Sequence, residues 1–247
     1  WFGLFVVAFC SPYLATVVVV KKAIDMDGVF WLHLLLAPAI FAWKMSAAFT
    51  FSYAAQAEVN DYWNTVLYWP IKLVVIFVLL LAIWKAWNGE KTIFGLGMRP
   101  PTWRPYLLML IIMVPLIAAA STQPDFLSVY PKLKHVDDVP HESYRWFYSL
   151  LYEVCYGLDF VGIELFFRGF LIIGFARWAG RHAILPMAVF YCTIHFGKPL
   201  GECISSFFGG LILGVVTYHS RTIWGGLIVH LGIAWLMEIG GYLGNRF

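Results

Sequence analysis

The sequence predicts an all-α fold, a polytopic transmembrane helix bundle of about eight spans. Of its 247 residues, 61% are hydrophobic and only 13% are charged. The mean hydropathy is +0.76, and apolar runs recur at lengths close to the roughly 20 residues that a helix needs to cross a bilayer. Soluble domains carry roughly 45–50% apolar and about 25% charged residues. The composition therefore excludes an ordinary soluble domain, a disordered chain and a disulfide-dense secreted scaffold.

Each predicted span is an apolar segment measured against the thickness of the bilayer. Helices are required because lipid cannot satisfy exposed backbone groups, and the continuous apolar runs lack the two-residue alternation of barrel strands. The sixth and seventh segments are short, so we expect them to tilt, to draw on flanking residues, or to lie against a thinned or water-filled region. In chain order the predicted spans are residues 2–20, 29–53, 62–87, 106–120, 147–174, 183–195, 205–218 and 223–243.

Two connectors interrupt these spans and suggest a division of the chain. Residues 88–105 are rich in Gly and Pro, which predicts an interfacial connector, and residues 121–143 are polar, which predicts an exposed cap. We expect residues 1–145 to form N-terminal transmembrane helices with both connectors, and residues 146–247 to form a core of four transmembrane helices. Tryptophans at the segment ends are predicted to be interfacial anchors: Trp63, Trp87, Trp103, Trp146 and Trp224.

Charge and cysteine content limit the partners. A net charge of +3 is too small to indicate nucleic acid. We expect the lipid bilayer as the main partner, in an integral, multi-pass protein of a bacterial cell membrane; the sequence sets no oligomeric state.

The cysteines have no CxxC spacing and lie in or beside apolar segments, so we predict small core residues without a disulfide or thiolate chemistry. They are Cys10, Cys155, Cys192 and Cys203.

The fifth segment carries ionisable side chains, which are costly inside a membrane and need a partner, a water-filled cavity or a function. Glu164 and Arg168 are four residues apart and share a helix face. Glu153 lies about three turns before Glu164, on nearly the same face, and Asp159 lies between them. This pattern predicts a polar, inward-facing stripe. The alternative is a Glu–Arg pair that only neutralises itself within the bundle.

Histidines in two later segments add candidate groups. His195 closes the sixth segment, where a histidine is often structural, and His230 lies inside the eighth segment, a more costly position. A neutral imidazole there can donate a hydrogen bond or bind a metal. For His33, Lys44 and Lys72 we expect local pairing or snorkelling, because no constellation surrounds them.

Glu164, His195 and His230 together provide one carboxylate and two imidazoles on separate spans. Such a set can activate water and stabilise an oxyanion, as amide hydrolysis requires. It can also form a His₂Glu site for zinc or another divalent metal with one position open for water. We predict no cofactor and retain the metal as the alternative, since spacing does not separate the two. HExxH, GxSxG and GxGD motifs are absent.

The polar residues lie in motifs that resemble those of the CPBP intramembrane proteases, also called the Abi family, which includes CAAX-processing and bacteriocin-processing enzymes. The resemblance covers residues 148–243. The motifs are Glu164-Leu-Phe-Phe-Arg168-Gly169-Phe170, Tyr191-x-x-x-His195, Gly209-Gly210-Leu-Ile-Leu-Gly214 and Ile223-Trp224-Gly-Gly-Leu-Ile-Val-His230.

This resemblance implies a membrane peptidase in which a glutamate and a histidine activate water. Carried over, Glu164 and Arg168 match the final Glu and the Arg of the family's EExxxR motif, His195 its second motif and His230 the later, oxyanion-stabilising histidine. Two positions depart from the pattern: Ile163 replaces the leading Glu, and Ala234 replaces the Asn after the last histidine.

The departures leave three possibilities for the general base. Glu164 takes the role, Glu202 or Glu238 enters from another helix, or the protein no longer cleaves. Our hypothesis is an endopeptidase that cuts a peptide or membrane-protein substrate near the membrane surface. Glu164 and His195 would activate water, and His230 would stabilise the oxyanion. The competing hypothesis is a non-catalytic scaffold, peptide-binding or immunity protein of the same family. A transporter is disfavoured because no internal repeat is visible.

Overall fold

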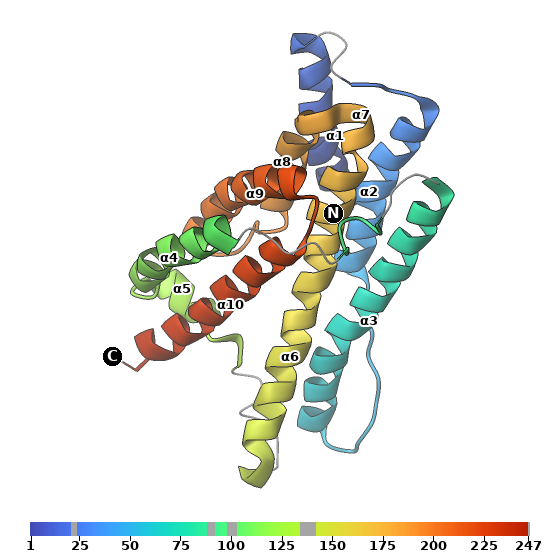
Figure 1. Cartoon of the computed structure of the whole chain (residues 1–247). Coiled ribbons are helices and arrows are strands. Elements are labelled where there is room, and N and C mark those ends of the chain that lie inside the picture. The colour runs from blue at the N-terminus through green and yellow to red at the C-terminus, as the bar shows by residue number, and fades with distance from the viewer. Residues whose placement is uncertain (21–23, 88–91, 98–102, 134–141, 247) are drawn as a thin grey trace. The chain divides into compact units, whose positions relative to one another are not determined.

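The computed structural model describes residues 1–20, 24–87, 92–97, 103–133 and 142–246. Within these ranges the chain forms helices and turns, and no β-strand occurs (Figure 1). The predicted all-α membrane bundle is therefore confirmed. In chain order the helices are α1 (Phe2–Val19), α2 (Gly28–Ser46), α3 (Ala57–Trp87), α4 (Trp103–Ala120), α5 (Pro124–Val129), η2 (Glu142–Tyr144), α6 (Arg145–Glu164), η3 (Leu165–Gly174), α7 (Ala176–Ala179), η4 (Gly180–Ala183), α8 (Ile184–Thr193), α9 (Leu200–Ser220) and α10 (Trp224–Gly244).

Among the described residues, six helices are long and apolar enough to cross a membrane: α1, α2, Val59–Trp87 of α3, α4, α9 and α10. The fifth predicted span forms α6 and η3. The acidic residues of α6 lower the hydropathy of that helix. The sixth forms α8, which has 10 residues and is about 15 Å long, half of the roughly 30 Å hydrocarbon core. The seventh is longer than predicted because α9 begins at Leu200.

The chain divides into two compact units, each built from three separate segments. Unit 1 contains Trp1–Ala47, Ile76–Thr102 and Ile163–Gly226. Unit 2 contains Ala48–Val75, Trp103–Gly162 and Leu227–Phe247. The boundary placed at residue 145 from the motifs stays a prediction.

Unit 1 is organised around α8, which packs against both α1 and α9. The core is mainly aromatic: the ring of Phe190 on α8 lies 4.8 Å from Phe5 and 5.3 Å from Phe167, measured between centroids. Close contact with α9 depends on glycine. A Cβ at Gly210 would lie 3.3 Å from Tyr191, and one at Gly214 would lie 2.9 Å from Ile184. The small-residue spacing of this motif thus serves packing within the unit.

The first connector contributes to this core instead of lying only at an interface. Its described part, residues 92–97, forms turns and buries Phe94 completely. A Cβ at Gly169 would lie 2.6 Å from the carbonyl oxygen of Phe94, so glycine allows this approach. Trp87 is also buried and donates a hydrogen bond to His33 at 2.9 Å, so its prediction as an interfacial anchor was wrong. Residues 88–91 and 98–102 of the connector lie outside the described residues.

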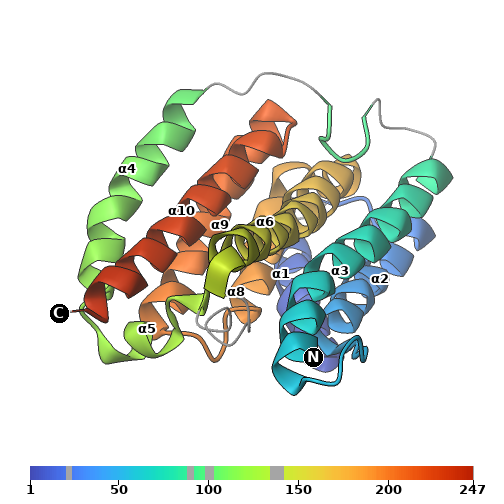
Figure 2. The same ribbon diagram turned by 90° about the horizontal axis from the view of Figure 1, so that it is seen from below.

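In unit 2, α4 and α10 lie side by side (Figure 2). Glycine again allows the contact, since a Cβ at Gly232 would lie 2.6 Å from the Leu110 side chain. The second connector, predicted to be an exposed cap, instead forms α5 and buries Phe126 and Tyr130 against this pair. Its two aromatic side chains supply the apolar area that the polar composition of the segment obscured. Residues 134–141 lie outside the described residues.

The glycine contact between α8 and α9 generates a stability prediction. Gly214→Ala places a methyl group within 3.2 Å of three side chains, and such overpacking costs about 1–3 kcal/mol. Gly209→Ala is the matched control on the same helix, because a Cβ there meets nothing within 4 Å. We expect thermal unfolding in detergent to show destabilisation for Gly214→Ala only. Equal melting temperatures for the two variants would contradict this packing.

Candidate active site

The candidate site of unit 1 begins with a buried ion pair at the junction of α6 and η3. Nη1 of Arg168 lies 3.3 Å from Oε1 of Glu164, and their side chains are 1% and 0% exposed. η3 is a π-helix, which closes hydrogen bonds between residues five apart; the N–H of Phe175 donates to the carbonyl oxygen of Phe170 at 3.3 Å. π-Helical segments are rare and occur frequently at functional sites. Glu164 and Arg168 thus sit where the regular α-helix changes its winding.

A glycine at the start of α10 lies against the Glu164 carboxylate. A Cβ at Gly226 would collide with Oε2 of Glu164, so any other residue at this position displaces the carboxylate or the helix. Both residues belong to unit 1. The start of α10 is tied to the first connector, because Nε1 of Trp224 donates to the carbonyl oxygen of Leu96 at 3.3 Å. The Gly-Gly motif therefore provides space for the acid.

Tyr191 of α8 links the ion pair to His195. The guanidinium carbon of Arg168 lies 4.2 Å from the centroid of the Tyr191 ring, a cation–π contact. The Tyr191 ring in turn lies 4.8 Å from the imidazole of His195, and the two rings meet edge to face. Three of the four predicted site residues, Glu164, Arg168 and His195, are thereby brought into one connected cluster.

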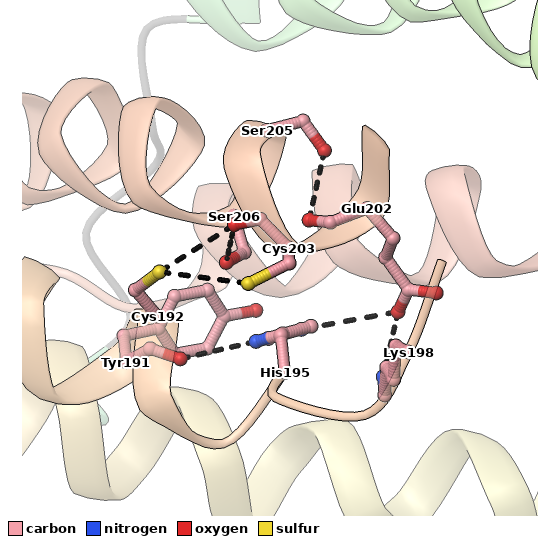
Figure 3. A network of polar contacts seen from close by, with 8 residues as sticks. All are labelled: Tyr191, Cys192, His195, Lys198, Glu202, Cys203, Ser205 and Ser206. Atoms are coloured by element: carbon pink, nitrogen blue, oxygen red, sulfur yellow. Dashed lines mark hydrogen bonds and ion pairs between the residues drawn. The ribbon is translucent and has the colours of Figure 1, made fainter. Parts of the chain in front are cut away.

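His195, which follows the end of α8, bonds back to that helix and faces a carboxylate (Figure 3). Its Nδ1 lies 3.0 Å from the carbonyl oxygen of Tyr191. A carbonyl only accepts hydrogen bonds, so Nδ1 carries the proton of this bond. Nε2 lies 4.0 Å from Oε1 of Glu202, in the first turn of α9. Nζ of Lys198 donates to the same oxygen at 2.6 Å.

Two free thiols flank this network, where α8 and α9 approach each other (Figure 3). Sγ of Cys192 lies 3.9 Å from Sγ of Cys203 and 3.5 Å from the Cys203 carbonyl oxygen. Both cysteines are partly buried. The cysteines of the chain are unbridged, as the sequence predicted, and this pair packs beside the network that contains His195 and Glu202.

His230 and Glu238 belong to unit 2. The imidazole of His230 lies 4.8 Å from the Phe160 ring, and its predicted convergence with Glu164 stays a prediction. The Glu238 carboxylate accepts two backbone hydrogen bonds, from the N–H of Lys132 at 2.9 Å and of Leu133 at 3.3 Å. These contacts favour a structural role for Glu238, which fixes the second connector to α10. Of the two alternative carboxylates, Glu202 is the one found beside His195.

The other buried basic residues have local contacts, as the sequence predicted. His33 uses both ring nitrogens: Nδ1 donates to the carbonyl oxygen of Val29 at 2.7 Å, and Nε2 accepts from Trp87. Nζ of Lys44 lies 5.4 Å from the centroid of the Phe41 ring, and Nζ of Lys72 lies 3.6 Å from that of Tyr68. These contacts account for the three basic side chains without assigning them a catalytic role.

No three His, Cys, Asp or Glu side chains group as a metal site would in the part of the chain that the structure describes. Within unit 1, His195 and Glu202 are two candidate donors, one fewer than the three protein ligands typical of catalytic zinc. The predicted metal set of Glu164, His195 and His230 includes a residue of unit 2 and stays a prediction.

Two residues of the site were visible in the motifs without an assigned role. Tyr191 supplies the ring between Arg168 and His195, and Gly226 supplies the space for Glu164. The regular spacing of Tyr191 one turn before His195 was the available signal for the first. The signal for Gly226 was the pair of glycines in the Trp-Gly-Gly sequence, which carry no side chain.

Comparison with known proteins gives one family. Residues 145–236 match the family described as "Type II CAAX prenyl endopeptidase Rce1-like". No curated protein and no solved structure matches the chain. The matched segment contains Glu164, Arg168, His195, Glu202 and His230, so the family signal and the polar cluster coincide. Residues 145–236 are thus similar to the Rce1-like CAAX endopeptidases, in agreement with the family resemblance that the sequence motifs predicted.

Proposed function

We propose that this membrane protein is an intramembrane endopeptidase that hydrolyses a peptide bond near the membrane surface. The Rce1-like match supports a CAAX-type protease kind of function. The observation that carries the proposal is the buried cluster in which Glu164, Arg168 and His195 are connected through one tyrosine ring. Ionisable groups at this depth are costly and mark functional sites. We expect a bacterial cell membrane as the location.

In the proposed reaction, Glu164 and His195 activate a water molecule that attacks the peptide carbonyl. Arg168 pairs with the Glu164 carboxylate and positions it, since an unpaired charge in this core would be very unfavourable. His230 donates a hydrogen bond to the oxyanion of the tetrahedral intermediate. His195 presents Nε2 for proton transfer because Nδ1 is committed to the carbonyl of Tyr191. The substrate is a peptide or membrane protein, and a prenylated CAAX peptide is the first probe because of the family's name.

A non-catalytic member that binds a membrane peptide is the second candidate. The 3.3 Å contact between Glu164 and Arg168 favours it, because a carboxylate neutralised by arginine needs no further role. A metal-assisted protease is the third. Cleavage assays in the presence of a chelator distinguish the metal-assisted route from the proposed one, which is insensitive to metal removal.

Glu164→Gln tests the central assignment. We expect kcat for peptide cleavage by the reconstituted protein to fall by about 10²–10⁴-fold. Because this change also leaves Arg168 buried without its anionic partner, it should cost about 3–5 kcal/mol of stability. The double variant Glu164→Gln with Arg168→Met removes both charges, so it should regain stability without regaining activity. Intact cleavage by Glu164→Gln would end the assignment.

Gly226→Ala tests whether the position of the Glu164 carboxylate matters. The added methyl group displaces the carboxylate, and misplacement of a reacting group by about 1 Å can cost on the order of 10²-fold in rate. We expect kcat to fall by that order while the protein stays folded. Gly209→Ala, whose Cβ meets nothing within 4 Å, should keep full activity. Equal kcat values for the two variants would show that the contact is incidental.

His230→Ala tests the proposed oxyanion donor. Loss of one such donor lowers kcat by about 10²–10³-fold. His219→Ala is the control, since His219 is exposed near the end of α9. Measurement of kcat and KM for both variants should show the loss in kcat for His230→Ala alone. Unchanged turnover would remove His230 from the mechanism.

A further inference from the structure

A pair of thiols lies between α8 and α9, and the proposed mechanism gives it no role (Figure 3). Sγ of Cys192 is 3.9 Å from Sγ of Cys203. The two cysteines are 11 residues apart in sequence, without the CxxC spacing of a redox motif, so their pairing depends on the fold. Both residues are partly exposed. The turn that joins the two helices is exposed at Phe196 and Gly197, so the pair lies near the surface of unit 1.

The close contact between α8 and α9 holds the two thiols side by side. A Cβ at Gly210 would lie 3.6 Å from Cα of Ala188, so the two backbones nearly touch there. Ala188 is one turn before Cys192 and shares its face of α8. Gly210 is about two turns after Cys203 and shares its face of α9. The thiols therefore face each other along the line of closest approach between the helices, at its end.

The hydrogen bonds around the pair stay satisfied when the thiol protons are lost. Sγ of Cys192 donates to the carbonyl oxygen of Cys203 at 3.5 Å. The hydroxyl of Ser206 donates to the same oxygen at 2.7 Å, so this carbonyl keeps a partner without the thiol. Because S–H is only a weak donor, its removal leaves this carbonyl bonded and costs little hydrogen-bond energy.

The segment between the two cysteines carries part of the candidate site. His195 is three residues after Cys192, and Glu202 directly precedes Cys203. A disulfide has an S–S length of about 2.05 Å, so bond formation would bring the two sulfur atoms about 1.9 Å closer than their present 3.9 Å. This movement acts on the end of α8 and the start of α9, the two places from which His195 and Glu202 project.

We propose that Cys192 and Cys203 form an oxidisable dithiol, that a small disulfide converts it into a disulfide bond between α8 and α9, and that this bond displaces His195 and lowers turnover. Only the effect on turnover rests on the proposed protease function. The dithiol itself is a chemical property of the folded chain.

The oxidation proceeds by thiol–disulfide exchange. One thiolate of the pair attacks a sulfur of the small disulfide, which forms a mixed disulfide and releases one small thiolate. The second thiolate attacks the protein sulfur of the mixed disulfide, which forms the bond between Cys192 and Cys203 and releases the second small thiolate. The pair loses two electrons and two protons. The small disulfide gains both and becomes two thiols.

The first experiment follows the bond itself in the full chain. The protein is incubated with oxidised glutathione, free thiols are alkylated with N-ethylmaleimide, and chymotrypsin cuts after Phe196, between the two cysteines. We expect mass spectrometry to find the peptides of Cys192 and Cys203 joined by a disulfide, and to find them separate after reduction with dithiothreitol. Cys10, also partly buried, is the internal control and should occur in no such linkage.

The second experiment measures kcat of the reconstituted protein on a prenylated CAAX peptide, or on another membrane peptide that the reduced wild type cleaves. Oxidation should lower kcat at least about tenfold, because misplacement of a reacting group by about 1 Å can cost on the order of 10²-fold. Dithiothreitol should restore it.

Matched variants assign the effect to the pair. Cys192→Ser keeps a donor for the Cys203 carbonyl, so it should show the kcat of the reduced wild type and lose the response to oxidant. Cys203→Ser provides the same test if Cys192→Ser does not fold. Cys10→Ser should respond to oxidant as the wild type does.

The outcomes separate the two parts of the proposal. Recovery of Cys192 and Cys203 in alkylated form after oxidation, or with glutathione on each and no bond between them, would overturn the dithiol. A bond that forms while kcat stays unchanged would overturn its effect on the site. If the reduced wild type cleaves no peptide although the bond forms, the protease function fails and the dithiol stands.

Discussion

The buried ion pair between Glu164 and Arg168 is the interaction on which unit 1 depends. Both side chains are almost completely inaccessible, in a core made mainly of phenylalanine rings. Removing two charges from water costs several kcal/mol for each ion, and only good geometry offsets this. In the structure the carboxylate lies 3.3 Å from the guanidinium, and an aromatic ring lies under the cation. Glycine at position 226 leaves the volume that the carboxylate occupies.

Three polar residues of the candidate site lie at or next to the ends of α-helices. Glu164 ends α6, His195 follows α8, and Glu202 lies in the first turn of α9. Helix ends carry backbone groups without intrahelical partners and a partial charge, so polar side chains are better satisfied there than along an apolar helix face. The shortness of α8 has the same effect. A helix of 10 residues that is covered by α1 and α9 brings His195 to a turn inside the unit.

Composition and motifs predicted much of this molecule. The high apolar content indicated a protein surrounded by lipid. The charged residues that interrupt the fifth segment indicated the position of the candidate site. Tertiary packing was less visible. Phe94 and Trp87 lie close to a connector in sequence, which suggested an interface, but the core of unit 1 buries them. The π-helical winding of η3 and the contact between Gly226 and Glu164 depend on neighbours far away in the chain. Ile163 is an aliphatic residue beside Glu164, and the carboxylate found next to His195 is that of Glu202, from α9.

The long sequence separation between Glu164 and Gly226 bears on how the protein is made. The ribosome adds Glu164 well before Gly226. During synthesis the Glu164 carboxylate therefore lacks its contact with Gly226 until the start of α10 has been made. Domains generally form as units in the order of synthesis, N-terminal parts first. Gly226, which packs against the Glu164 carboxylate, is thus among the last residues of unit 1 to be added. Glu164 and Arg168 are therefore both present in a newly made chain before the glycine that packs against the carboxylate is added.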